Sequence, residues 1–374
     1  MHCMGDHMTI NPTLSAALRV AIERAIATGF EEGIQLCVFQ HGQRVVDLTV
    51  GTRDDAGTPL RPDDLSFVWS TSKGITATAV HILAERGLIQ YDDAIANYWP
   101  AFARNGKAAI SIRHIMSHTA GIYPNPVLNG YEELRDYETV CTAIAAMTPL
   151  HQPGQSHIYH PLTYGWPLAK VIEAVTGMPF GAFIQTEICA PLGLTDLFIG
   201  LPAGRQADVA RTSIDVDPAL LQATPDNPLP DPSIMANDPA IWATCMPAAN
   251  MLASARAIAT VYAALIGDGV DGVRLLSQRQ LANATRVQCW LVDAESQHET
   301  GHSLGFALGK ATAHYGALPT AFGHCGYGGS TGFADPQYGM AFAMTKTRMN
   351  LHPEAPSLKR ELAAIVRQHL TPFG

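Results

Sequence analysis

The chain of 374 residues has little charge and no cluster of basic residues. Asp, Glu, Lys and Arg make up 15% of it, and 24 basic against 33 acidic side chains give a formal net charge of −9. Basic side chains never follow one another in a long run. Nucleic-acid-binding proteins and polybasic membrane modules both need clustered positive charge. The composition therefore excludes both classes.

Long apolar runs are also missing. A membrane-spanning helix needs about 20 apolar residues, and the longest stretch without a charged side chain, 139–169, is interrupted by prolines. The N-terminus lacks the basic region and apolar run of a signal peptide. We expect a chain without a membrane span, beginning with a disordered or cloning-derived tail at residues 1–8.

Cysteine is the third residue type whose pattern excludes something. The seven cysteines are scattered, and none forms a Cys-x-x-Cys pair. An odd and dispersed set is typical of reduced thiols, not of a disulfide framework or a zinc site. We expect a cytoplasmic protein that needs neither a metal nor an organic cofactor, and the sequence leaves its oligomeric state open.

The two ends of the chain share one pattern. The 47% apolar composition and the length predict one large or two fused globular domains. Helical periodicity at 14–30 is followed by a hairpin, with strands at 34–40 and 43–50 around His41-Gly42. Near the C-terminus, short strands and a last helix are predicted at 303–309, 320–326, 330–334, 339–345 and 357–370.

The middle of the chain alternates helical patterns with long loops. A helix over 168–176 is expected to end at Gly177, and another over 179–189 to have a proline at its first position. The stretch 202–239 carries too many prolines for regular structure. One sheet built from both ends, with a mostly helical insertion, is the arrangement that we expect.

The most informative stretch is Trp69-Ser70-Thr71-Ser72-Lys73, which precedes an apolar helical run. If Ser70 opens this helix, Lys73 lies one turn later on the same face, whereas Ser72 points about 100° away. A serine becomes nucleophilic when a base accepts its proton, and a lysine can do so if desolvation or nearby cations lower its pKa. The alternative is a helix N-cap at Ser70 beside a solvated Lys73.

Three further blocks accompany this stretch. Ser70-Thr71-Ser72-Lys73 resembles the Ser-x-x-Lys signature of penicillin-binding proteins and serine β-lactamases. Residues 112–122 are similar to the segment after the nucleophile helix of class C β-lactamases, and residues 152–161 to their Tyr-x-Asn block. Gly323-His324-Cys325-Gly326-Tyr327 stands where that family has Lys-Thr-Gly. The closest resemblance, over residues 30–347, is to family VIII carboxylesterases.

This resemblance implies the DD-peptidase/β-lactamase fold, a mixed α/β architecture with an antiparallel sheet flanked by helices. Residues 1–88 and 290–374 would form the α/β domain, and 89–289 an inserted helical domain, with the active site in the cleft between them. Ser70 would be the nucleophile, and Lys73 and Tyr159 would handle its proton. Which of these two is the base at each step stays open.

The resemblance also implies the surroundings of the nucleophile. The backbone N–H groups of Ser70 and Tyr327 would form the oxyanion hole, because two converging donors stabilise a tetrahedral intermediate. Core packing is the alternative role for the aromatic residues near the site. The candidates for substrate contact are Trp69, Tyr123, His160, His324, Cys325 and Gly326.

Two departures from the family pattern bear on the substrate. Pro161 replaces the asparagine of Tyr-x-Asn, so it can offer only a backbone carbonyl. His324 replaces the lysine of Lys-Thr-Gly, which exchanges a permanent cation for a largely neutral ring. Penicillins and peptidoglycan stems carry a carboxylate, so a site without that lysine favours neutral esters.

Two other motifs offer competing interpretations. Gly328-Gly329-Ser330-Thr331-Gly332 fits Gly-x-Ser-x-Gly, but that nucleophile elbow needs a helix after it and a strand-like segment follows. His114 and His118 have zinc-binding spacing without an accompanying glutamate. We expect Ser330 to be a strand residue and the two histidines to be structural.

The sequence therefore predicts a serine hydrolase that cleaves small neutral carboxylic esters through an acyl-Ser70 intermediate. An acyltransferase, an amide hydrolase or a β-lactam hydrolase of the same fold would use the same residues with another acceptor or leaving group. A penicillin-binding sensor or scaffold without turnover is a third alternative. The expected partner is a small-molecule ester, with no nucleic acid and no membrane.

Overall fold

The computed structural model describes residues 10–123, 125–215, 231–292, 299–309, 320–351 and 357–372. The tail at residues 1–8 and the centre of the proline-rich stretch lie outside this part of the chain, and so do the predictions made for them.

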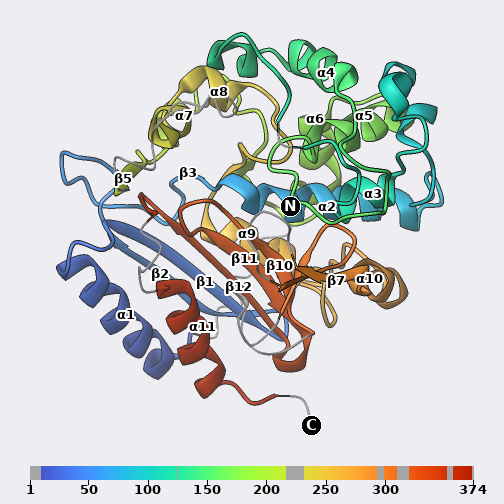
Figure 1. The fold of residues 1–374 in the computed structure, drawn as a ribbon. Coiled ribbons are helices and arrows are strands. Elements are labelled where there is room, and N and C mark those ends of the chain that lie inside the picture. The colour runs from blue at the N-terminus through green and yellow to red at the C-terminus, as the bar shows by residue number, and fades with distance from the viewer. Residues whose placement is uncertain are drawn as a thin grey trace.

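One large antiparallel sheet is built from both ends of the chain (Figure 1). Its strand order is β2-β1-β12-β11-β10-β9-β8-β7, and β1 pairs with β12 from Ile34 opposite Lys346 to Gln40 opposite Met340. The predicted sheet from both termini is confirmed. The strands are β1 (Gly33–Gln40), β2 (Gln43–Gly51), β7 (Cys289–Val292), β8 (Glu299–His302), β9 (Ala307–Leu308), β10 (Phe322–Cys325), β11 (Thr331–Asp335) and β12 (Met340–Lys346).

The predicted hairpin is formed by β1 and β2, and its turn explains why. His41 and Gly42 both have positive φ, 50° and 75°, as a two-residue hairpin turn requires. Alternate side chains of β1 point to opposite faces of the sheet, and those on both faces are buried. Ile34, Leu36 and Val38 belong to one apolar core and Cys37 to the other.

Helices cover both faces of this sheet (Figure 1). The terminal helices α1 (Pro12–Ala27) and α11 (Leu358–His369) lie side by side on one face, where they enclose a core with β1, β2 and β12. The other face packs against α9 (Ala255–Ala263), which contacts β1, β11 and β12. This helix falls within the segment 89–289, so part of that segment lies on the sheet.

The rest of the middle segment is helical with short strands. The predicted end of a helix at Gly177 is confirmed, since this residue caps α5 with a φ of 70°. The helices of this segment are α3 (Ile112–Met116), α4 (Tyr137–Ala146), α5 (Gly165–Thr176), α6 (Phe180–Ile184), α7 (Pro232–Ala236), α8 (Pro239–Ala243) and α10 (Gln278–Thr285). The helix α2 (Ser72–Glu85) precedes this segment. Two small sheets contain β3 (Ser66–Phe67), β6 (Leu252–Ala253) and β4 (Leu197–Phe198), and β5 (Ser213–Asp215) with β13 (Arg348–Asn350).

Two local predictions need correction. Pro179 is the N-cap of α6, not its first helical residue, and α6 continues as a π-helical turn over Gln185–Cys189. The proline-rich stretch contains regular structure after all, because Pro232 and Pro239 begin the short helices α7 and α8. Proline fits the first turn of a helix, where its missing N–H is not needed.

No single helix in the described residues is long and apolar enough to cross a membrane. One bent pair, Gly165–Thr176 with Phe180–Cys189 at 74°, passes that test of length and composition together. The cysteines within the described residues are all free thiols, as predicted: Cys37, Cys141, Cys189, Cys245, Cys289 and Cys325.

Candidate active site

Ser70 lies in a tight turn immediately before the long buried helix α2. Residues Trp69–Thr71 form a 3₁₀ turn, and α2 begins at Ser72 with Thr71 as its N-cap. The expectation that Ser70 opens α2 needs correction, because Ser70 lies two residues before the first residue of the helix. The N-cap alternative is also wrong, since Thr71 is the N-cap and Lys73 is buried. Trp69 has a φ of 51°, an uncommon conformation for a bulky residue.

Lys73 points from α2 toward Ser70 and is completely buried. Its Nζ lies 3.0 Å from Ser70 Oγ, 2.8 Å from the carbonyl oxygen of Pro161 and 3.0 Å from that of Ala248. Burial lowers the pKa of Lys73 well below its ordinary value because desolvation disfavours the ammonium form. A lysine can accept a serine proton only if its pKa is lowered, and in this site desolvation lowers the pKa of Lys73.

All three partners of Nζ are oxygen atoms that can accept a hydrogen bond. In the ammonium form, Nζ has three N–H donors, which match Ser70 Oγ and the carbonyls of Pro161 and Ala248. In the neutral form, two N–H donors remain for the two carbonyls, and the lone pair would then face the hydroxyl of Ser70. The two carbonyls therefore hold Nζ against Ser70 in either form.

The carbonyl of Ala248 reaches Lys73 because the segment around it packs closely on α2 and α5. Thr76 Oγ1 donates to the carbonyl of Pro247 over 2.6 Å. A Cβ on Gly165 would lie 2.6 Å from the backbone nitrogen of Ala248, so only glycine permits this approach. Neither acceptor carbonyl left a side-chain signal in the sequence.

Tyr159 completes the group around the nucleophile. Its phenol hydrogen-bonds with the side chain of Ser70, and Lys73 Nζ lies 5.0 Å from the centre of its ring. Burial raises the pKa of Tyr159, an effect that the hydrogen bond with Ser70 partly offsets. Burial therefore favours the protonated phenol of Tyr159 and the neutral amine of Lys73.

Ser72, the other serine of the motif, has a structural role. Its hydroxyl is buried, donates to the carbonyl of Trp69 and accepts from the Met251 N–H at 3.0 Å. Because both of these bonds are made away from Lys73, the expectation that Ser72 faces elsewhere is confirmed.

Hydrogen bonds connect the turn between β10 and β11 to the turn that holds Ser70. Ser330 Oγ donates to the carbonyl of Val68 over 2.8 Å and lies 3.1 Å from Thr71 Oγ1. A Cβ on Gly326 would come within 2.2 Å of both Ser330 Oγ and the Val68 oxygen. No sequence pattern indicates this contact between Thr71 and Ser330. The expectation that Ser330 is a strand residue is wrong, because Ser330 lies immediately before β11. A strand and not a helix follows it, so it is not a nucleophile elbow.

Most predicted pocket residues lie around this turn. The rings of Trp69 and Tyr327 meet edge to face with centres 5.7 Å apart, and Tyr327 is 52% exposed. The ring of His324 lies 6.0 Å from that of Tyr159. Cys325 Sγ is 3.2 Å from Thr331 Oγ1.

Tyr123 and His160 have other surroundings. Tyr123 follows Ile122, whose carbonyl accepts from Thr163 Oγ1 over 2.6 Å, and its contact with substrate stays a prediction. His160 is completely buried, and its Nδ1 pairs with the carbonyl of Ile158 at 2.6 Å. Like that of Tyr123, its contact with substrate stays a prediction.

The two histidines with zinc-like spacing do not share a helix. His114 forms a capping box with Ser111 at the start of α3, as the structural interpretation predicted. His118 comes after α3 ends and has a φ of 58°. Within the described residues, no group of three or more His, Cys, Asp or Glu side chains is arranged to hold a metal ion.

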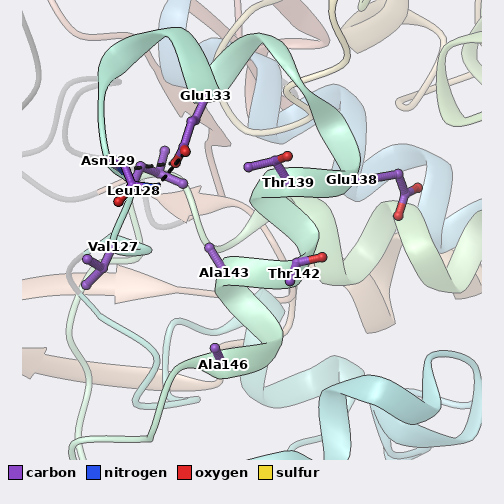
Figure 2. Close-up of a pocket in the computed structure, with 9 residues that line it drawn as sticks. All are labelled: Val127, Leu128, Asn129, Glu133, Glu138, Thr139, Thr142, Ala143 and Ala146. Carbon is purple, nitrogen blue, oxygen red and sulfur yellow. Dashed lines mark hydrogen bonds between the residues drawn. The ribbon is translucent and has the colours of Figure 1, made fainter.

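A separate hollow of about 380 Å³ lies between α4 and the segment before it (Figure 2). Ser70, Lys73 and Tyr159 do not line this hollow. Asn129 and Glu133 are hydrogen-bonded on one side, whereas Glu138 points away. The lining residues are Val127, Leu128, Asn129, Glu133, Glu138, Thr139, Thr142, Ala143 and Ala146.

An antiparallel sheet covered by helices on both faces, with a buried lysine against a serine at a helix start, defines a serine hydrolase of the β-lactamase type. The Beta-lactamase family model matches residues 21–367. The chain therefore belongs to the beta-lactamase family, which confirms the predicted fold.

Known relatives agree with this assignment. The chain is 34% identical to the Esterase/beta-lactamase LipL of Mycobacterium tuberculosis, covering 91% of this chain and 86% of LipL. It is similar to the crystal structure of a family VIII carboxylesterase, with a TM-score of 0.88, 32% identity and coverage of 96% and 98% of the two chains. A penicillin-binding protein homologue from Caulobacter crescentus matches with a TM-score of 0.82, 30% identity and coverage of 96% and 99%.

Proposed function

We propose that this protein hydrolyses small neutral carboxylic esters through a covalent ester on Ser70. The observation that carries the proposal is the environment of Lys73, whose Nζ is held by two carbonyls and lies 3.0 Å from Ser70 Oγ. The names of LipL and of the family VIII carboxylesterase support an ester as the substrate.

The first half of the reaction forms the acyl-enzyme. Lys73 accepts the hydroxyl proton of Ser70 while Oγ attacks the ester carbonyl carbon. The negative charge on the carbonyl oxygen is stabilised by the backbone N–H groups of Ser70 and Tyr327. When the intermediate collapses, the bond to the alkoxide breaks and Tyr159 donates its proton to that oxygen. The proton on Lys73 then passes to the phenolate of Tyr159, because the acylated Ser70 Oγ no longer carries a hydroxyl proton.

The second half reverses the sequence with water. A water molecule loses a proton to the same basic groups as it attacks the acyl carbon, and the bond to Ser70 Oγ breaks. Ser70 recovers its proton, and the carboxylic acid leaves. This assignment gives Lys73 the role of base and Tyr159 the role of acid, because burial favours the neutral form of both.

The preference for neutral esters follows from His324. This residue stands where the relatives with Lys-Thr-Gly have a cation, and its ring is nearly buried beside Tyr159. The exposed ring of Tyr327 and the ring of Trp69 add an aromatic wall at the same end. An aromatic and largely uncharged surface suits a small acyl or alkyl group better than a carboxylate.

We also infer that the catalytic groups meet between two parts of the chain. Ser70, Lys73 and Tyr327 come from 1–88 and 290–374, whereas Tyr159 and the Ala248 carbonyl come from 89–289. A cytoplasmic location remains part of the proposal, and the free thiols support it.

The test uses p-nitrophenyl esters from acetate to octanoate beside a chromogenic cephalosporin. We expect fast turnover of short esters, negligible cephalosporin turnover, and an acyl adduct on Ser70 in quenched samples by mass spectrometry. Ser70→Ala should lower kcat/KM by on the order of 10⁴-fold or more, whereas Ser72→Ala should keep the reaction.

Each alternative predicts a different result in the same assay. A rate restored only by an added alcohol or amine would indicate an acyltransferase, and fast cephalosporin turnover a β-lactam hydrolase. A stable adduct without turnover would indicate a sensor. Full activity of Ser70→Ala would contradict the covalent mechanism altogether.

A further inference from the structure

His118 holds the backbone on both sides of Tyr159. Its carbonyl oxygen accepts the N–H of Ile158 at 3.1 Å, and its Nδ1 accepts the N–H of His160 at 3.1 Å. Tyr159 is the residue between these two donors. A single residue, His118, therefore holds the peptide units before and after Tyr159.

The ring of His118 also packs against the side chain that it frames. The centres of the His118 and Tyr159 rings are 4.7 Å apart, with the planes tilted by 46°. The His118 side chain is buried, with 1% of the residue exposed. The same residue thus restricts both the backbone and the ring of Tyr159.

The local backbone of His118 is unusual. Its φ of 58° lies in the left-handed region, where residues with a bulky side chain are uncommon. This conformation follows the end of α3, where the His118 N–H bonds to the carbonyl of Ile115 at 3.1 Å. Backbone strain of this kind persists where the surroundings hold the residue in place.

The hydrogen bond at Nδ1 defines the protonation state of the ring. A backbone N–H can only donate, so Nδ1 carries no proton and the ring is neutral. Desolvation lowers the pKa of His118 well below its ordinary value, and nearby ionisable groups lower it further. The groups that face or influence the ring are Lys73, His157, Tyr159, His160, Tyr164 and His302.

We propose that His118 is a positioning residue that fixes Tyr159 for proton transfer to the leaving alcohol. The inference rests on the role of Tyr159 given above. His118 acts only through the two N–H groups and the ring contact, and it does not touch the reacting atoms. Nothing in the Ser-x-x-Lys or Tyr-x-Asn signatures assigns it this task.

The consequence is a dependence on the leaving group. An alkoxide is a strong base and needs a proton as its bond to carbon breaks, whereas p-nitrophenolate is a weak base and leaves without one. Loosening Tyr159 therefore slows the cleavage of an ethyl ester much more than that of the p-nitrophenyl ester of the same acid. General loss of folded protein would slow both equally.

The experiment compares His118→Ala with His118→Asn on these two esters. The alanine variant lacks the acceptor, and we expect kcat on the ethyl ester to fall on the order of 10²-fold, with a fall below about tenfold on the p-nitrophenyl ester. Asparagine has an acceptor oxygen at a similar position and tolerates a positive φ. His118→Asn should therefore recover most of the lost rate.

Two matched variants separate positioning from folding. His81 is also a buried histidine, with its Nδ1 2.7 Å from Tyr91 Oη and its Nε2 2.9 Å from the carbonyl of Leu304. His81→Ala should lower the Tm and leave the ratio of the two ester rates unchanged. His118→Gly relaxes the backbone without restoring the acceptor, so it should stay impaired on the ethyl ester.

A double-mutant cycle with Tyr159→Phe completes the test. If His118 acts through Tyr159, His118→Ala should change the rate of Tyr159→Phe by less than about threefold. An equal loss in both backgrounds, or an unchanged ester ratio in His118→Ala, would overturn the inference and leave the proposed function intact. A wild-type rate of Tyr159→Phe on the ethyl ester would instead contradict the proposed role of the tyrosine itself.

Discussion

The carbonyl oxygen of Pro161 accepts a hydrogen bond from Lys73 Nζ over 2.8 Å. Residue 161 is the position where the family has the asparagine of Tyr-x-Asn, and from the sequence its proline offered nothing but this carbonyl. The structure uses that carbonyl to orient the lysine. The substitution therefore removes an amide that could face substrate and keeps an acceptor that the lysine needs.

Lys73 and Lys107 form a matched pair of buried lysines that separates catalysis from folding. Both are completely buried, and Lys107 Nζ donates to the carbonyls of Arg104 at 2.8 Å and Ala145 at 2.9 Å, away from Ser70. Lys73→Met should lower kcat/KM by on the order of 10³-fold because it removes the base. Lys107→Met should lower the Tm while kcat/KM stays within about threefold, as general base catalysis does not involve it.

The depressed pKa of Lys73 determines how activity responds to pH. Only the neutral amine can accept the Ser70 proton, so kcat/KM should be maximal above the pKa of Lys73. Below it, kcat/KM should fall by about tenfold for each unit of pH. Because burial lowers this pKa, full activity should persist well below the ordinary pKa of lysine. A profile that rises only near the ordinary pKa of lysine would contradict this.

Ser72 is expected to matter for stability rather than for chemistry. Ser72→Ala leaves the buried Met251 N–H without its acceptor, which costs roughly 1–3 kcal/mol. We expect a lower free energy of unfolding in urea and a kcat reduced by less than about tenfold, with the acyl group still found on Ser70. Loss of the acyl adduct in this variant would show that the wrong serine has been assigned.

Ser330 should couple the turn that holds Tyr327, a proposed oxyanion donor, to the turn that holds Ser70. Ser330→Ala removes the bonds to the Val68 carbonyl and to Thr71 Oγ1, so the free energy of unfolding should fall by about 1–3 kcal/mol. The turn that holds Tyr327 then loses its attachment, and kcat should fall more than KM rises. Ser213→Ala, which removes a bond to Glu32 at 2.7 Å elsewhere, is the control and should leave kcat unchanged.

His324→Lys tests the explanation for substrate charge. A cation at this position should improve kcat/KM for an ester or β-lactam with a carboxylate by about 10- to 150-fold, the effect of one charge-assisted hydrogen bond of roughly 1.5–3 kcal/mol. The neutral p-nitrophenyl acetate should gain nothing. An equal gain on both substrates would show that His324 does not select against the carboxylate.

Local sequence patterns were sufficient for much of this fold. The hairpin of β1 and β2, the terminal helices and the helix end at Gly177 follow from periodicity and turn chemistry within a few residues. The short helices α7 and α8 do not follow from such patterns, because a high density of prolines argues against helices. A proline at the first helical position does not do so.

Ser70, Lys73 and Tyr159 were named from the sequence because each is a side chain with its own chemistry at a recognisable spacing. The carbonyls of Pro161 and Ala248 could not be, since every residue has one and only packing decides which of them reaches Lys73. The identity and spacing of the side chains are enough to show which groups have the chemistry to react. Only the fold shows that Lys73 is shielded from water, because burial is a property of the whole core and of no single residue.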